Sequence, residues 1–235
     1  DEDNAYTTLE HQWDEAFGYW GGARDYSQYT DEEIAGAGGR PEFENGYHDT
    51  DGDGLVDLLG ELNFSASVNA AKRDLGSTAA DPTDFSGDAD LAFRTGRAII
   101  TEAHESGQEV DLAALSAQRD IAVLAWEKAY AATAIHYIND VLADMDAIGG
   151  EDYSFADHAK HWSELKGFAL GFQFNPRSPM SEADFAAVHA AVGDAPVGAS
   201  PSEPVDDAPY RAALLDARSL IGDAYDFDEA NVTSW

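Results

Sequence analysis

The sequence has no cysteine and very little positive charge. The absence of cysteine excludes disulfides, thiolate metal sites and cysteine nucleophiles. Only 13 lysines and arginines stand against 46 aspartates and glutamates, so the formal net charge is 13 − 46 = −33. Because proteins bind nucleic acids and anionic membranes by neutralising phosphates with Lys and Arg, this balance argues against both as partners. No apolar run approaches the roughly 20 residues of a membrane span, so the sequence predicts no transmembrane segment.

What is present is enough for a folded core. The chain has 235 residues, of which 44% are hydrophobic and 11% aromatic, whereas disordered acidic chains are poor in aromatics. A surface rich in aspartate and poor in lysine is typical of proteins that stay hydrated in concentrated salt, which indicates a halophilic or marine bacterium. An ordinary acidic exported protein is the alternative. Because the sequence begins at Asp1 without a methionine or a signal-like segment, we expect a processed or trimmed chain.

Helical periodicity dominates, and strand patterns are nearly absent. The sequence predicts helices over Ala5–Trp20, Ser65–Leu75, Asp88–Ser106, Asp111–Ile148, Tyr153–Phe174, Ser181–Val192 and Asp207–Tyr225. The helix from Asp111 carries apolar residues on two faces, which is typical of a helix inside a bundle. We therefore predict one all-α domain over residues 1–235, a bundle of about four long helices with short additions. A long acidic loop at 24–62 and a connector at 193–208 interrupt it.

The most specific local motif lies in that acidic loop. Three aspartates at a spacing of two, Asp49, Asp51 and Asp53, offer the carboxylate oxygens that calcium prefers. Further ligands are the backbone carbonyl of Leu55 and the carboxylate of Asp57, at the seventh and ninth loop positions. The twelfth position of an EF-hand loop is normally Glu, but here it is Gly60, and Glu61 follows one residue late. The sequence predicts a weak structural calcium site of extracellular type rather than a regulatory EF-hand; the alternative is a solvated acidic turn.

Histidines and carboxylates recur on three of the predicted helices, the arrangement from which helix bundles build metal sites. The candidate ligands of a second metal, such as iron, copper or zinc, are His11, Asp14, His136, His161 and Glu164. The alternatives for each are a surface ion pair or a core histidine with satisfied hydrogen bonds. The zinc-protease pattern His-Glu-x-x-His, the Gly-x-Ser-x-Gly elbow, phosphate-binding loops and dinucleotide fingerprints are all absent.

Three segments, spread in order over most of the chain, resemble the domain of unknown function 4856 family of exported bacterial proteins. They are Glu10–Tyr19 (EHQWDEAFGY), Ala92–Ala98 (AFRTGRA) and His161–Phe168 (HWSELKGF). The helical pattern is also similar to that of imelysin-like proteins. The resemblance implies an all-helical fold and a secreted, periplasmic or cell-surface location, but no known activity.

Imelysin-like proteins carry a Gly-x-His-x-x-Glu motif that is discussed for metal binding or peptidase action. Ala159 replaces that glycine before His161 and Glu164, and Asp14 replaces the glutamate after His11. We therefore favour an exported helical binding module over an enzyme, with a calcium-stabilised loop and a candidate second metal. Two alternatives stay open: a metal-dependent hydrolase of imelysin type, and a surface protein that associates with itself or with a cell-surface partner.

Overall fold

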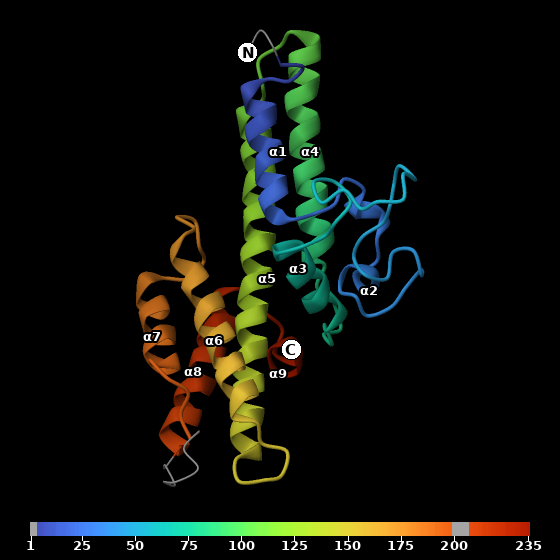
Figure 1. The fold of residues 1–235 in the computed structure, drawn as a ribbon. Coiled ribbons are helices and arrows are strands. Elements are labelled where there is room, and N and C mark those ends of the chain that lie inside the picture. Colours follow the sequence, from blue (N-terminus) through green and yellow to red (C-terminus); the bar gives the residue numbers. More distant parts are fainter. Residues whose placement is uncertain (1–3, 199–206) are drawn as a thin grey trace. The chain divides into compact units, whose positions relative to one another are not determined.

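The computed structural model describes residues 4–198 and 207–235, and within them the fold is all-α (Figure 1). The described residues form no strand, apart from one isolated antiparallel bridge between Tyr47 and Leu62. The α-helices are α1 (Thr8–Trp20), α2 (Asp31–Ile34), α3 (Ala66–Leu75), α4 (Phe85–Ser106), α5 (Leu112–Ala147), α6 (Phe155–Leu170), α7 (Glu182–Val192), α8 (Ala208–Ala224) and α9 (Glu229–Ser234), with short 3-10 helices at Tyr26–Gln28 and Gly171–Gln173. The all-α prediction is confirmed. No helix in the described part of the chain has the length and apolar character needed to cross a membrane.

The chain divides into two compact units. The first unit comprises Asp1–Leu75 with Thr83–Ala129, and the second comprises Gly76–Pro82 with Tyr130–Trp235. Helix α5 runs from one unit into the other without a break. The single domain over residues 1–235 that we expected from the sequence stays a prediction.

In the first unit, α1 packs against α4, and α3 packs against both α2 and α4. The buried indole of Trp20 meets Trp126 of α5 edge to face, with ring centroids 5.6 Å apart. The segment at 24–62, predicted as a long acidic loop, contains a 3-10 helix and α2. It also has a small core of its own, made of Ala23, Tyr26, Tyr29, Ile34 and Phe43 with Ala71 of α3. This core holds the acidic segment against the helices.

In the second unit, α6, α7 and α8 pack in succession, and α9 packs on α8. The C-terminal half of α5 buries Ile135, Ile138 and Val141 completely. Asn139 of α5 donates from its Nδ2 to the backbone oxygens of Val232 and Trp235, at 3.1 and 2.7 Å. The C-terminal residues are therefore held to α5 by hydrogen bonds.

Helix starts and stops differ from the predicted ones by a few residues, for identifiable reasons. Helix α4 begins at Phe85 rather than Asp88, because Asp84 caps it by accepting from the N–H of Gly87. Helix α1 begins at Thr8 rather than Ala5, because Thr7 and Glu10 form a capping box. Helix α6 ends at Leu170, where the chain tightens into a 3-10 turn. Of the predicted connector at 193–208, residues 199–206 lie outside the described residues.

Candidate metal centre

The structure brings together three of the six predicted calcium ligands. Carboxylate oxygens of Asp49, Asp51 and Glu61 all lie within 4.8 Å of one another. In residues 4–198 and 207–235, this is the only group of three or more His, Asp or Glu side chains close enough to share a metal ion. Carboxylate oxygens are ligands for hard cations such as calcium and magnesium.

Glu61 reaches the group because the two ends of the loop pair with each other. The backbone N–H of His48 donates to the carbonyl of Glu61 at 3.2 Å, next to the Tyr47–Leu62 bridge. Glu61 is only 6% exposed, and its side chain accepts from the backbone N–H groups of Thr50 at 2.7 Å and Asp57 at 2.9 Å. Its place one residue beyond the EF-hand position is therefore compatible with a ligand role, because the bridge sets its distance from Asp49.

Asp49 organises the tip of the loop. Its two carboxylate oxygens accept from the backbone N–H groups of Gly52 at 2.7 Å, Gly54 at 2.8 Å and Asp53 at 3.2 Å. Gly52 and Gly54 have φ angles of 75° and 85°, a left-handed backbone that side-chain-bearing residues rarely adopt. The loop therefore wraps its N–H groups around one carboxylate, which fixes that carboxylate facing Glu61.

These hydrogen bonds keep both carboxylates ionised. The backbone N–H of Asp57 is the main cause that lowers the pKa of Glu61, and that of Gly54 is the main cause for Asp49. The ionised groups also repel each other, since Asp49 raises the pKa of Glu61. Charged oxygens held this close are an arrangement that a divalent cation neutralises.

The other three predicted ligands lie outside the group of three. The Asp53 carboxylate accepts from the backbone N–H of Leu55 at 2.8 Å, and that of Asp57 from Leu59 at 2.9 Å. The Leu55 side chain is exposed, as expected for a residue that would offer only its carbonyl. A role for Asp53, Leu55 and Asp57 in binding stays a prediction.

The five candidate ligands of a second metal are not brought together. In the first unit, the ring of His11 stacks on Tyr6 with centroids 5.4 Å apart, and Asp14 accepts from Arg97 at 2.8 Å. In the second unit, His161 pairs with Asp144. His136 pairs with Asp140, and Glu164 lies near Lys160, at 3.2 and 3.8 Å. In the described part of the chain, these five therefore form no group of three ligands, and the second metal stays a prediction.

Sequence reasoning missed Asp144 as the partner of His161. The two side chains lie 2.7 Å apart, Nδ1 to Oδ2, and they come from α5 and α6. Nearby, the fully buried His158 meets the Tyr153 hydroxyl at 3.2 Å through its Nδ1. Burial lowers the pKa of His158. The only signal in the sequence was the polarity of the last turn of α5 and the first turns of α6. Which of these polar residues pair with each other cannot be predicted until the packing of the two helices is known.

No family model, curated protein sequence or solved structure matches the chain. The resemblance to the domain of unknown function 4856 family therefore stays a prediction from three short segments.

Proposed function

We propose that this chain is an exported helical binding protein whose acidic segment binds calcium through Asp49, Asp51 and Glu61. The observation that carries the proposal is the convergence of these three carboxylates within 4.8 Å of one another. All three are oxygen ligands, which calcium prefers, and none is a histidine or a thiolate, which transition metals prefer.

The bound ion would stabilise the segment rather than take part in a reaction. Without a cation, the cluster adds repulsion to a chain whose net charge is already −33. With a cation, carboxylates on both sides of the Tyr47–Leu62 bridge are joined. The exposed loop tip leaves room for water in the coordination sphere. We expect weak binding, with a Kd of roughly 10⁻⁴–10⁻³ M, the class typical of extracellular modules.

An exported location is part of the same proposal. Weak calcium sites of this class are filled only where calcium is abundant, which is outside the cytosol. The high acidity and the absence of cysteine are compatible with a secreted, periplasmic or cell-surface protein of a halophilic or marine bacterium. The helices provide the scaffold, and the acidic segment provides the site.

The test is a calcium titration followed by thermal unfolding. Calcium at millimolar concentration is expected to raise the Tm, and a chelator to reverse the rise, because a ligand that binds only the folded state stabilises it. The Asp51→Asn and Glu61→Gln variants should lose this response. Glu32→Gln is the matched control, since Glu32 is an exposed carboxylate on α2, outside the cluster. A wild-type Tm that does not change with calcium would overturn the proposal.

The same titration bears on two further points. The Asp53→Asn variant shows whether calcium recruits the Asp53 carboxylate, which accepts from the backbone N–H of Leu55. Light scattering during the titration shows whether calcium drives association of copies of the chain. If calcium bridges the acidic surfaces of different copies, the scattered intensity should rise with calcium and fall again with a chelator. Calcium bound within one chain should leave the scattered intensity unchanged.

A further inference from the structure

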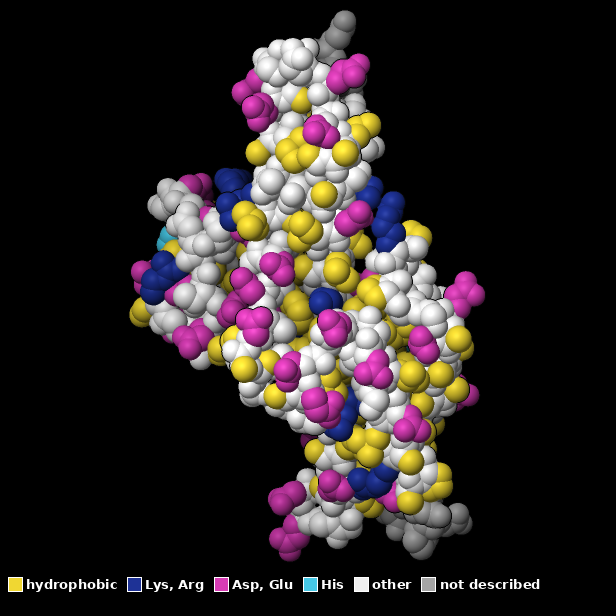
Figure 2. All heavy atoms as spheres, turned by 180° about the vertical axis from the view of Figure 1, so that it is seen from behind, with side chains coloured by type: hydrophobic (Ala, Val, Ile, Leu, Met, Phe, Trp, Pro, Cys, Tyr) yellow, Lys and Arg dark blue, Asp and Glu magenta, His cyan; other side chains and the backbone are white. Residues whose placement is uncertain are grey.

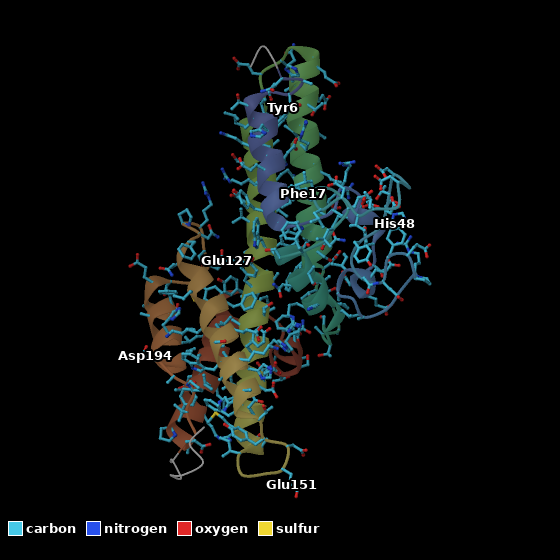
Figure 3. The ribbon with its side chains drawn as sticks, viewed as in Figure 1. Tyr6, Phe17, His48, Glu127, Glu151 and Asp194 are labelled. Carbon is cyan, nitrogen blue, oxygen red and sulfur yellow. The ribbon has the colours of Figure 1, made fainter. Side chains whose placement is uncertain are left out.

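A hollow of about 450 Å³ opens in the first unit between α1, α4 and the segment that follows α1. Its apolar wall consists of Trp13, Phe17 and Phe93. The indole Nε1 of Trp13 donates to the carbonyl of Phe93 at 2.8 Å, and both α1 rings meet the Phe93 ring edge to face. Figure 3 labels Phe17 near the C-terminal end of α1. Rings held in this way form a preformed wall, and the volume is within the range of small-molecule sites.

Arginines gather at this hollow, although cations are scarce in the chain. Arg24, Arg94 and Arg97 all line it. They are three of only nine arginines in a sequence with a net charge of −33. Figure 2 shows how sparse Lys and Arg are among the acidic side chains on the face that it draws. Whether the hollow can bind an anion depends on which of these guanidinium groups is not already paired with a carboxylate.

Two of these arginines already have carboxylate partners. Arg97 holds Glu10 and Asp14, each at 2.8 Å, and Arg94 holds Asp90 at 2.7 Å. These pairs hold the two guanidinium groups against their own carboxylates and leave little positive charge uncompensated. They shape the rim of the hollow rather than offer an empty binding position.

The guanidinium of Arg24 is different. The backbone N–H of Arg24 donates to the carbonyl of Gly60 at 2.8 Å. The Arg24 side chain makes no hydrogen bond or ion pair with any residue that the structure describes. The side chain lies against the backbone of Gly60, where an added Cβ would come within 2.8 Å of Nη2. Arg24 therefore presents uncommitted N–H donors at the edge of an aromatic wall.

We propose that this hollow binds a small aromatic monocarboxylate, with its carboxylate on Arg24 and its ring against Trp13, Phe17 and Phe93. The planar guanidinium fork matches a carboxylate through two parallel hydrogen bonds. Asp14 and Asp90 also line the hollow, so a doubly charged anion such as a phosphate monoester meets repulsion there. None of the three clustered carboxylates lines the hollow, so calcium and the aromatic acid would occupy different positions.

Gly18 gives a way to fill the hollow without disturbing the fold. It lies on α1, lines the hollow, and an added Cβ there meets no atom within 4 Å. A leucine at this position would extend into the space that the ligand needs. Since leucine favours helix more than glycine does, the Gly18→Leu variant is expected to keep α1 intact.

The experiment is isothermal titration calorimetry of the full chain with 2-naphthoate. The calcium concentration is in the millimolar range and is the same in every titration. The probes for comparison are 2-naphthamide, which has the same rings without the charge, and 2-naphthyl phosphate. The variants are Arg24→Gln, Gly18→Leu and, as a matched control, Arg119→Gln. Arg119 is a partly exposed arginine of α5 in the same unit, paired with Asp120 and outside the hollow.

The proposal expects 2-naphthoate to bind at least about tenfold more tightly than either comparison probe, as befits one charge-assisted bidentate contact. Arg24→Gln should weaken it by about the same factor, and Gly18→Leu should abolish it, while Arg119→Gln should bind as the wild type does. Circular dichroism of each variant checks that it is folded. Equal affinity for the amide, tighter binding of the phosphate, no detectable binding of 2-naphthoate, or wild-type affinity in folded Arg24→Gln would each overturn the proposal.

Discussion

Several carboxylates of this acidic chain have specific structural roles. Glu10 and Glu33 are both almost fully buried, and each closes a capping box with a threonine three residues earlier. Each also forms an ion pair with an arginine: Glu10 with Arg97, and Glu33 with Arg40. Because such groups are stabilised as anions by hydrogen bonds, they give the fold a dependence on pH that scattered surface carboxylates do not.

Glu33 is the clearest test at the scale of one residue. Its side chain is 1% exposed and forms two hydrogen bonds with the Arg40 guanidinium, at 2.7 and 2.8 Å. The Arg40 contact is the main cause that lowers its pKa from 4.5 to about 2. We expect Glu33→Gln to destabilise the protein by about 2 kcal/mol at neutral pH, because a buried charged hydrogen-bond network loses one partner. Urea denaturation measures this difference.

The pH dependence of the Glu33→Gln effect follows from the direction of the pKa shift. A carboxyl whose folded pKa lies below its unfolded value stabilises the fold above the unfolded pKa and loses that contribution as pH falls through the folded one. The difference between wild type and variant should therefore shrink between pH 4.5 and about 2. Glu32→Gln, at the exposed neighbouring carboxylate, should show no such change. An equal destabilisation at both ends of this range would contradict the assignment.

Asp74 has the opposite pH dependence. Burial raises its pKa to about 6, although it accepts from the backbone N–H groups of Phe85 and Ser86 at the start of α4. Since the folded state holds this proton more tightly than the unfolded state, the contribution of Asp74 to stability increases as pH falls through about 6. Buried carboxyls in one chain thus favour opposite ends of the acidic range.

At the scale of whole elements, the sequence alone predicted every long helix. The apolar period over Asp111–Ile148 corresponds to α5, and the glycines after Trp20, Leu75, Ser106 and Val192 mark the ends of four helices. The predicted calcium loop contains the one carboxylate cluster found among the described residues. These features are local, and so local patterns identify them.

What the sequence did not predict depends on contacts between distant segments. Helices α2 and α9 are too short to show a clear apolar period in the sequence. The small core around Tyr26 holds α2, and the hydrogen bonds of Asn231 hold α9. The aromatic hollow joins α1, α4 and the segment after α1, three pieces that no spacing rule connects. The partnership of Asp144 and His161 likewise required the packing of α5 on α6.

Asn231 tests how α9 is held in the second unit. Its side-chain oxygen accepts from the backbone N–H groups of Thr78 and Ala79, at 2.8 and 3.0 Å, and the residue is 1% exposed. We expect Asn231→Ala to cost about 2–3 kcal/mol, because two N–H donors lose their acceptor. Thr233→Ala, at an exposed position of the same helix, is the control and should cost much less. A chemical denaturation series measures both, and equal costs would contradict this role of Asn231.

Two glycines in helices should respond in opposite ways to alanine. A Cβ at Gly96 of α4 would lie 2.0 Å from Cζ2 of Trp13, so Gly96→Ala should force α1 and α4 apart and cost about 1–3 kcal/mol. At Gly167 of α6, the Cβ meets nothing within 4 Å, and Gly167→Ala should stabilise by about 0.5–1 kcal/mol. Thermal unfolding of the pair provides an internal comparison. If both substitutions destabilised the protein equally, the cost of Gly96→Ala could not be assigned to the close approach of Trp13.

At the scale of the whole molecule, the net charge of −33 is only partly compensated. Some acidic groups are paired with arginines, and three are clustered in the predicted calcium loop. Other acidic side chains are scattered over the face shown in Figure 2. Their mutual repulsion opposes the compact state, and dissolved salt reduces it. Acidity of this kind therefore links the stability of the fold to ionic strength.

The resulting prediction separates the two origins considered for this composition. Raising sodium chloride from about 0.1 M to about 1 M shortens the Debye length from roughly 10 to 3 Å, so repulsion between exposed carboxylates is screened. The urea midpoint of unfolding should rise over this range if the surface is adapted to concentrated salt. Sucrose in place of salt is the control, because it favours compact states by exclusion from the surface without screening charge. The Asp51→Asn variant should keep the salt response while losing the calcium response, since monovalent screening acts on the whole surface and calcium on one cluster. A midpoint that stays constant or falls with sodium chloride would instead fit an ordinary acidic exported protein whose charges are already well dispersed at low salt.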